Sequence, residues 1–284
     1  MLVITGATGA LGRAIVRNLM GRVPPSQIAA SVRDPAKAHD LVDAGVRVRR
    51  GDFAEPSTLA AAFEGASTVL IVSVMSHGEG AVRQHRAAID AAREAGAQRI
   101  VYTSQMGSNL SSPFSPMPDH ARTEELLRES GVPFVALRNG FYAASAKSMF
   151  GHAMQTGVLA APADGPIAWT AHRDLAEAAA IAMTDDACGL DGITPPLTAG
   201  EAIDLERVAA IMSKVAGRTV KRVVVSDEEY AAALGERGMP EHVVHLLVGM
   251  FAASRIGQFA MLDPTLERLI GRRPMQLAET LAER

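Results

Sequence analysis

The sequence predicts an α/β fold of the Rossmann type, in which a doubly wound parallel sheet carries a smaller, mostly helical C-terminal part on its substrate side. Short apolar segments alternate with helix-like segments through about the first 140 residues. The first apolar segment also runs directly into a glycine-rich turn. Repeated strand–helix–strand units with short apolar strands are typical of a parallel sheet that helices cover on both faces.

The composition is that of a globular protein. Of the 284 residues, 48% are hydrophobic and 21% are charged, which provides ample apolar material for a core. The formal net charge of −3 lacks the basic excess of a general nucleic-acid binder. The one cysteine, Cys188, lies in a turn-like run, so we expect a bystander thiol and no intrachain disulfide, as suits a reducing cytoplasm.

No segment of the sequence is typical of targeting or of membrane insertion. The chain passes from Met1 directly into an apolar run, without a basic leader or a cleavage site. No apolar run reaches the roughly 18 residues that span a bilayer. We therefore expect a cytoplasmic protein, either a monomer or a homodimer, with no membrane partner and no nucleic-acid partner.

Six strands are expected in the first part of the chain, at residues 2–5, 28–32, 46–49, 69–72, 100–103 and 134–137. Helices are expected at 10–20, from Asp34-Pro35, from Glu55-Pro56-Ser57, at 79–95 and at 119–130. Asp34 followed by Pro35 indicates a helix start, because Asp is preferred at the N-cap and Pro at the first helical position. The stretch 111–118, rich in Ser and Pro, is predicted to be a mobile loop.

Helical patterns dominate after about Gly140. They cover residues 173–183, 205–216, 227–236, 241–255 and 264–270, with an isolated strand at 220–225. We therefore divide the chain into a Rossmann domain, residues 1–140, and a smaller, mostly helical domain, residues 141–284, with some exchange of chain back to the sheet. The second domain is expected to close over the carboxyl edge of the sheet.

The most specific motif is the glycine-rich turn between the first strand and the first helix, Gly6-Ala7-Thr8-Gly9-Ala10-Leu11-Gly12. In this spacing one glycine makes the turn, one lets the backbone approach a pyrophosphate, and one lets the helix pack closely on the strand. The helix N-terminus adds free N–H groups and a partial positive charge. The turn therefore predicts dinucleotide binding.

The end of the second strand indicates which dinucleotide is bound. An acid there usually holds the ribose of NAD, whereas Arg accommodates the 2′-phosphate of NADP. Here Arg33 follows the strand, with Lys37 one turn into the next helix, and Asp34 is better explained as a cap. The pattern favours NADPH over NADH. By position alone, Asp52 and Phe53 are expected beside the adenine.

The reactive end of the cofactor is expected over the loops that follow strands four to six, which carry Ser73-Val74-Met75, Ser104 and Asn139-Gly140-Phe141-Tyr142. The Tyr-x-x-x-Lys pair of ordinary short-chain dehydrogenases is missing from the sequence. At its expected place stand His120 and Glu124, which share one helical face. They form either an acid/base site or a structural helix pair.

Other polar residues give weaker signals. His242 and His245 lack a carboxylate at ligand spacing, so no metal site is expected. His85 is better explained as a satisfied helix histidine than as a catalyst. Trp169 fits a core position and a substrate-stacking position equally well.

Several motifs in this order resemble those of the NmrA-like atypical short-chain dehydrogenases, and within them the NADPH-dependent quinone oxidoreductases and triphenylmethane reductases. The motifs are Gly6-x-x-Gly9-x-x-Gly12, Val32-Arg33-Asp34-Pro35-Ala36-Lys37, Tyr102-Thr103-Ser104, His120-x-x-Thr123-Glu124 and Leu137-Arg138-Asn139-Gly140-Phe141-Tyr142. The resemblance implies that NADP(H) contacts the glycine turn, Arg33, the 73–75 loop and the 137–142 loop. In this group the absence of Tyr-x-x-x-Lys is normal.

The resulting hypothesis is an NADPH-dependent reductase that transfers a hydride to quinones or similar flat conjugated acceptors. His120, Asn139 and Tyr142 are the candidate catalytic residues. The alternative is an NmrA-like redox sensor that binds NADP(H) without turnover. Reduction of aryl ethers or isoflavonoids is less favoured, because those enzymes would have a Lys where His120 stands.

Overall fold

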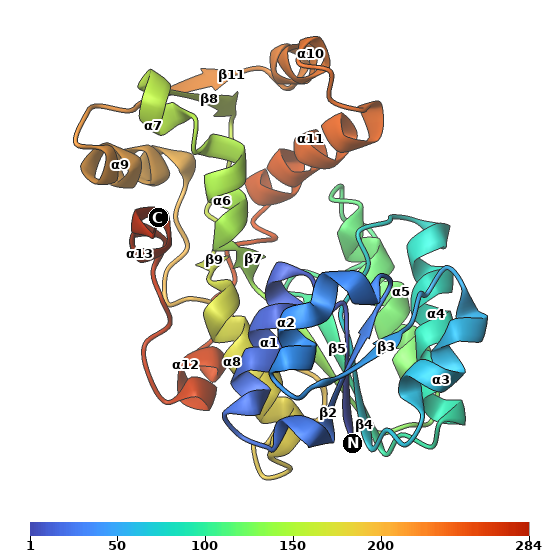
Figure 1. Ribbon diagram of the computed structural model, residues 1–284. Helices are drawn as coiled ribbons and strands as arrows, with labels where there is room; N and C mark the ends of the chain where they lie inside the picture. Colours follow the sequence, from blue (N-terminus) through green and yellow to red (C-terminus); the bar gives the residue numbers. More distant parts are fainter. Residues whose placement is uncertain (284) are drawn as a thin grey trace.

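A parallel sheet of seven strands forms the centre of the larger lobe in the computed structural model, which describes residues 1–283 (Figure 1). Its strand order is β10-β6-β5-β4-β1-β2-β3. The strands are β1 (Leu2–Thr5), β2 (Ile28–Val32), β3 (Arg47–Arg50), β4 (Thr68–Ile71), β5 (Arg99–Gln105), β6 (Phe134–Asn139) and β10 (Gly192–Ile193). The predicted doubly wound Rossmann-type sheet is confirmed. Because the winding reverses between β1 and β4, a crevice is expected at their carboxyl ends.

Helices cover both faces of the sheet (Figure 1). On one face lie α1 (Ala10–Met20), α2 (His39–Asp43) and α8 (His172–Thr184), with α12 (Thr265–Ile270) packed against α8. On the other face lie α3 (Leu59–Phe63), α4 (Glu79–Glu94) and α5 (Pro116–Glu129). Successive strand residues point to opposite faces, so Val3 of β1 enters the α3–α5 core and Ile4 the α1–α8 core.

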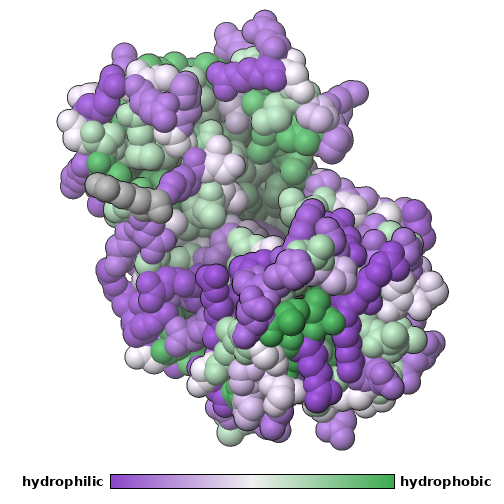
Figure 2. Space-filling view, viewed as in Figure 1, coloured by the Kyte–Doolittle hydropathy of each residue, from purple (hydrophilic) through white to green (hydrophobic). Residues whose placement is uncertain are grey.

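The smaller lobe, which is the upper one in the space-filling view (Figure 2), has its own core. This core includes the buried rings of Trp169, Phe251 and Phe259. Trp169, 2% exposed, is therefore core filler and not a stacking platform. The lobe contains β7 (Phe141–Tyr142), α6 (Ala143–Phe150), α7 (Ala153–Thr156), β8 (Val158–Pro162), β9 (Trp169–Thr170), α9 (Leu205–Ala216), β11 (Lys221–Val225), α10 (Asp227–Glu236), α11 (Glu241–Arg255) and α13 (Leu277–Ala282).

The structure corrects three expectations about the elements. The strand expected to be isolated at 220–225 pairs in parallel with β8, whose Ala- and Pro-containing sequence gives little strand signal. The stretch 111–118 is only partly a loop, because α5 begins at Pro116, where Pro suits a first helical position. The short strand β10 was not expected, and it joins the sheet edge beside β6.

The second half of the chain returns to the sheet. α8 packs along α1, and α12 packs along α8, although both follow the smaller lobe's first elements in sequence. This return carries His172, at the start of α8, to the edge of the sheet where the crevice lies. Within residues 1–283, no helix combines the length and the apolar character needed to cross a bilayer.

Candidate active site

A large cavity opens at the carboxyl ends of the central strands, with a volume of about 890 Å³. Its wall includes residues predicted to hold a dinucleotide: Gly6, Thr8, Gly9, Ala10, Leu11, Gly12, Arg33, Lys37, Asp52, Phe53, Ser73, Val74, Met75 and Tyr142. The motif residues from β1, β2, β3 and β4 thus meet at the reversal of the winding.

Gly12 and Gly9 differ in why a side chain is missing from the turn. A Cβ on Gly12 would lie 2.3 Å from the carbonyl oxygen of Gly6, so close packing of α1 on the turn requires glycine there. A Cβ on Gly9 would approach no protein atom nearer than 3.4 Å, and the φ of Gly9 is −78°. The protein itself therefore does not demand glycine at position 9. A glycine at this position instead leaves the backbone open to the cavity.

The first turn of α1 offers backbone donors to the cavity. No side chain caps this helix, whose N-cap is Gly9. The free N–H groups and the partial positive charge of a helix N-terminus favour a phosphate at this place.

Three cationic side chains line the cavity beside the glycine turn. Arg33 is exposed, and within residues 1–283 no carboxylate lies within ion-pair distance of it. Lys37 is 3.9 Å from Asp34, which also accepts a hydrogen bond from the N–H of Ala36 at 3.1 Å. The expected capping role of Asp34 is therefore confirmed. Arg13, the third cation, pairs with a carboxylate of α2.

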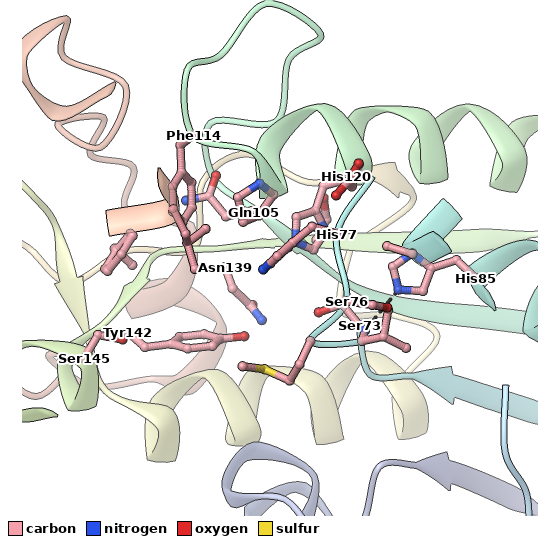
Figure 3. A pocket seen from close by; sticks show the side chains of 18 of the residues that line it. Ser73, Ser76, His77, His85, Gln105, Phe114, His120, Asn139, Tyr142 and Ser145 are labelled. Carbon is pink, nitrogen blue, oxygen red and sulfur yellow. Dashed lines mark hydrogen bonds between the residues drawn. The ribbon is translucent and has the colours of Figure 1, made fainter. Parts of the chain in front are cut away.

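A second, smaller cavity of about 240 Å³ adjoins the first (Figure 3). Ser73, Val74, Met75, Ser76 and Tyr142 line both cavities. The predicted residues Ser104, His120, Asn139, Gly140 and Phe141 line the smaller one. The two spaces meet at the loop after β4 and at Tyr142, so a molecule in one cavity can touch a molecule in the other.

The loop after β4 is held at both ends by buried side chains. The N–H of Val74 donates to Nε2 of His85 at 3.1 Å, and the N–H of Gly78 donates to Oδ2 of Asp119 at 2.7 Å. Burial raises the pKa of Asp119. Between these anchors Met75 is 90% exposed and stands over the junction of the two cavities.

His85 is a satisfied histidine, as expected, although it also lines the smaller cavity. Its Nδ1 lies 2.9 Å from Oγ1 of Thr123, whose hydroxyl donates to the carbonyl oxygen of Asp119 at 2.8 Å. Nδ1 is therefore the protonated nitrogen, and Nε2 accepts from Val74. Burial lowers the pKa of His85 to about 4, so the ring is neutral.

His120 stands on the first turns of α5 and lines the smaller cavity. Its Nδ1 lies 2.7 Å from the hydroxyl of Tyr102, a fully buried residue of β5. Burial lowers the pKa of His120 to about 3, with a further contribution from His85. His120 is therefore a neutral imidazole at physiological pH.

Within residues 1–283, Glu124 makes no hydrogen bond to His120. Its carboxylate accepts hydrogen bonds from Nε of Arg138 at 3.0 Å, from Nη2 of Arg138 at 2.8 Å and from the hydroxyl of Ser104 at 2.7 Å. Glu124 lies one helical turn beyond His120, on the side of α5 that packs against β5 and β6. The burial of the Glu124 carboxylate beside Arg138 supports the interpretation of Glu124 as a structural residue.

Asn139 and Tyr142 come to the cavity from the end of β6 and from β7 (Figure 3). Asn139 is 2% exposed, and its Oδ1 has no hydrogen-bond partner within residues 1–283. Burial raises the pKa of Tyr142, whose ring packs against His172 with 4.4 Å between centroids. Tyr142 therefore lies at the junction of the two cavities, and Asn139 lies in the wall of the smaller one.

Three predicted contact residues line neither cavity: Ala7, Leu137 and Arg138. Ala7 and Leu137 are fully buried in the core, and the guanidinium of Arg138 is used by Glu124. The 137–142 loop thus reaches the site only from Asn139 onwards.

Several lining residues were not predicted from the sequence. Arg13 directly follows the last glycine of the turn, and Gln105 directly follows Ser104. Both could have been predicted because they are sequence neighbours of predicted site residues. Other lining residues depend on which elements meet in space, and they include Gln84, His172, His77 and Asp119.

The chain is similar to known proteins over almost its whole length. The NmrA-like family matches residues 1–283. Quinone oxidoreductase 2 of Escherichia coli strain K12 is 35% identical over 283 residues, which are 99% of this chain and 98% of the relative. The crystal structure of an NADPH-dependent quinone oxidoreductase from Escherichia coli, complexed with NADPH, matches with a TM-score of 0.93 at 34% identity and covers 99% of both chains. The Citrobacter sp. triphenylmethane reductase complexed with NADP(H) matches with a TM-score of 0.91 at 31% identity and 99% coverage of both chains.

Proposed function

Since the chain belongs to the NmrA-like family, we propose that it is an NADPH-dependent reductase that delivers a hydride to quinones or similar flat conjugated acceptors. The observation that carries this proposal is the pair of adjoining cavities that share Tyr142 and the loop 73–76. A dinucleotide in the large cavity would place its reactive ring at the junction, and an acceptor in the small cavity would lie against it.

The residues of the large cavity fit NADPH. The glycine turn and the N-terminus of α1 would hold the pyrophosphate. Gly9, where no protein atom requires a glycine, leaves room for it. Arg33 and Lys37 would hold the 2′-phosphate, since both line the cavity at the end of β2. When bound, NADPH supplies the hydride.

The small cavity is suited to positioning more than to acid catalysis. Its wall combines aromatic and aliphatic side chains, including Phe114, Phe141 and Leu246, with a few polar groups. Phe114 and Phe141 pack against each other with 5.8 Å between ring centroids, so a flat acceptor meets a rigid apolar wall. Quinone reduction needs one hydride and one proton, and a hydroquinone oxygen can take that proton from water. Holding the acceptor against the cofactor then supplies most of the rate.

A steady-state assay tests the proposal. We expect the purified protein to oxidise NADPH in the presence of a panel of small benzoquinones and naphthoquinones, with one hydroquinone formed per NADPH consumed. NADH should support much less turnover at equal concentration. Tight binding of NADP⁺ and NADPH with no turnover on any acceptor would instead favour the redox-sensor alternative.

A further inference from the structure

We infer that Tyr102 is a positioning residue that fixes the tautomer of His120, so that His120 presents an N–H to the acceptor cavity and favours acceptors with a carbonyl oxygen. The inference rests on the proposed function and names the chemistry by which the small cavity recognises its acceptor. The supporting geometry is a hydrogen bond of 2.7 Å between the Tyr102 hydroxyl and Nδ1 of His120.

The direction of this hydrogen bond follows from the surroundings of Tyr102. The side chain is fully buried, and burial raises the pKa of the phenol well above its usual value, so the hydroxyl keeps its proton. Two side chains offer this hydroxyl a hydrogen bond, Nδ1 of His120 at 2.7 Å and the hydroxyl of Thr123. A buried hydroxyl proton without an acceptor is costly. Tyr102 therefore donates, and Nδ1 of His120 accepts.

Nδ1 of His120 is the better acceptor for the phenol, because the oxygen of Thr123 already accepts a hydrogen bond from Nδ1 of His85. The two ring nitrogens of His85 are taken by Thr123 and by the N–H of Val74. The hydroxyl of Thr123 itself donates to the carbonyl oxygen of Asp119. The rings of His85 and His120 pack on Tyr102 with centroids 5.3 Å and 5.7 Å away. Two neutral histidines thus stand beside Tyr102 in opposite tautomers.

With Nδ1 occupied as an acceptor, the proton of the neutral His120 ring is on Nε2. His120 lines the small cavity, as do Asn139 and Tyr142 (Figure 3). An uncharged N–H in a largely apolar cavity donates a hydrogen bond to a carbonyl oxygen, but it forms no hydrogen bond with a hydrocarbon of the same shape. A quinone oxygen is an acceptor of this kind, and it becomes a better one as it gains negative charge on reduction.

Nitrogen NMR of the holoprotein tests the tautomer directly. We expect the NADP⁺ complex, labelled with ¹⁵N-histidine, to show His120 with a protonated Nε2 and an unprotonated Nδ1. His85 should show the reverse pattern. Tyr102→Phe should weaken this preference and shift the His120 nitrogens, whereas the matched variant Tyr230→Phe should leave them unchanged, because Tyr230 packs on Phe251 outside both cavities. A protonated Nδ1 on His120, or no response to Tyr102→Phe, would overturn the inference.

A ligand pair tests the carbonyl preference in the same sample. Adding 1,4-naphthoquinone to the NADP⁺ complex should shift the Nε2 proton of His120 downfield, and naphthalene should not. Equal shifts with both compounds would mean that the N–H does not meet the carbonyl. These signals do not depend on turnover, so a correct tautomer with no NADPH oxidation would count against the proposed function alone.

A double-mutant cycle shows whether Tyr102 acts through His120. We expect Tyr102→Phe to lower kcat/KM for naphthoquinone by about two- to tenfold, the range for one neutral hydrogen bond, and Tyr230→Phe to lower it by less than about twofold. In the His120→Phe background, Tyr102→Phe should have almost no further effect. If the reduction in kcat/KM of the double variant equals the product of the two single reductions, Tyr102 acts independently of His120, against the inference.

Discussion

Glu124 and Arg138 form a two-point ion pair next to Ser104, with Nε and Nη2 of the arginine 3.0 and 2.8 Å from the two carboxylate oxygens. The pair joins α5 to β6, and Glu124 is only 3% exposed. A carboxylate held in this way cannot also orient His120. The same ion pair keeps Arg138 out of the cofactor cavity, so it decides the roles of two residues at once.

Breaking this pair should cost stability and little activity. Glu124→Gln keeps the shape of the side chain but removes a charged partner from buried hydrogen bonds, and we expect a loss of about 2 kcal/mol in the free energy of unfolding. Urea denaturation measures it. The neighbouring Glu125→Gln is the matched control, because the exposed Glu125 is 3.9 Å from Arg128 and should matter by less than about 0.5 kcal/mol. Similar losses for both variants would contradict the structural role.

Removal of the His120 ring should reduce quinone turnover only modestly. A general acid contributes about 10²–10⁴, whereas we expect His120→Ala to lower kcat by less than about tenfold. Burial holds the pKa of His120 near 3, so the ring stays neutral at higher pH and contributes no titration step between about pH 6 and pH 8. Wild type and variant should therefore have parallel pH profiles. A drop beyond a hundredfold, with a step near pH 6.5, would make His120 an essential acid.

Arg33→Asp should weaken NADPH binding selectively. The change replaces the proposed 2′-phosphate partner with a repelling charge, and a charge-assisted hydrogen bond contributes about 1.5–3 kcal/mol, so the affinity should fall at least tenfold. Binding of NADH, which lacks the 2′-phosphate, should change much less. Fluorescence titration with both cofactors measures the difference. Equal weakening of both, or of neither, speaks against the role of Arg33.

Substitutions at the last two glycines of the turn should have different effects. Gly9→Val should fold, since a Cβ there has 3.4 Å of room, but should bind neither cofactor because the side chain occupies the place of the pyrophosphate. Gly12→Ala should destabilise the protein by about 1–3 kcal/mol, because its Cβ would lie 2.3 Å from the carbonyl oxygen of Gly6. Circular dichroism and cofactor titration separate the effects. A folded Gly9→Val protein with normal affinity would exclude the turn from the site.

Burial of neutral His85 should make stability fall in mild acid. The unfolded chain protonates this histidine below its ordinary pKa of 6.5, whereas the folded protein does so only near 4. The unfolded state thus binds more protons in this window, and the free energy of unfolding should fall as the pH falls through it. Between about pH 7 and pH 5 this group should account for about 1–2 kcal/mol.

His85→Gln, which retains a donor and an acceptor, should reduce this acid sensitivity in urea denaturation at the two pH values. The exposed His242→Gln is the control and should leave the pH dependence unchanged. An identical pH dependence in wild type and His85→Gln would show that His85 is not held neutral by the fold.

Local sequence patterns were enough to predict six of the seven strands of the sheet and the glycine-rich turn. Both depend on interactions between residues close in sequence. Apolar runs form buried strands, Asp34 caps the short helix that begins at Pro35, and Gly12 must lack a Cβ beside Gly6. Strands β1 and β2 have the bounds expected from their apolar runs, because hydrophobic burial ends where polar residues begin.

The arrangement of residues around the small cavity depends on packing between elements that are far apart in the sequence. Whether Glu124 faces His120 or Arg138 depends on how α5 packs against β5 and β6, and helical spacing alone allows either arrangement. Likewise β8 becomes a strand by pairing with β11 across about 60 residues of chain. His172 reaches the cavity only because α8 returns to the sheet. The tautomer of His120 depends on Tyr102, which comes from another element altogether. These relationships arise from contacts between distant segments, and a local pattern does not encode them.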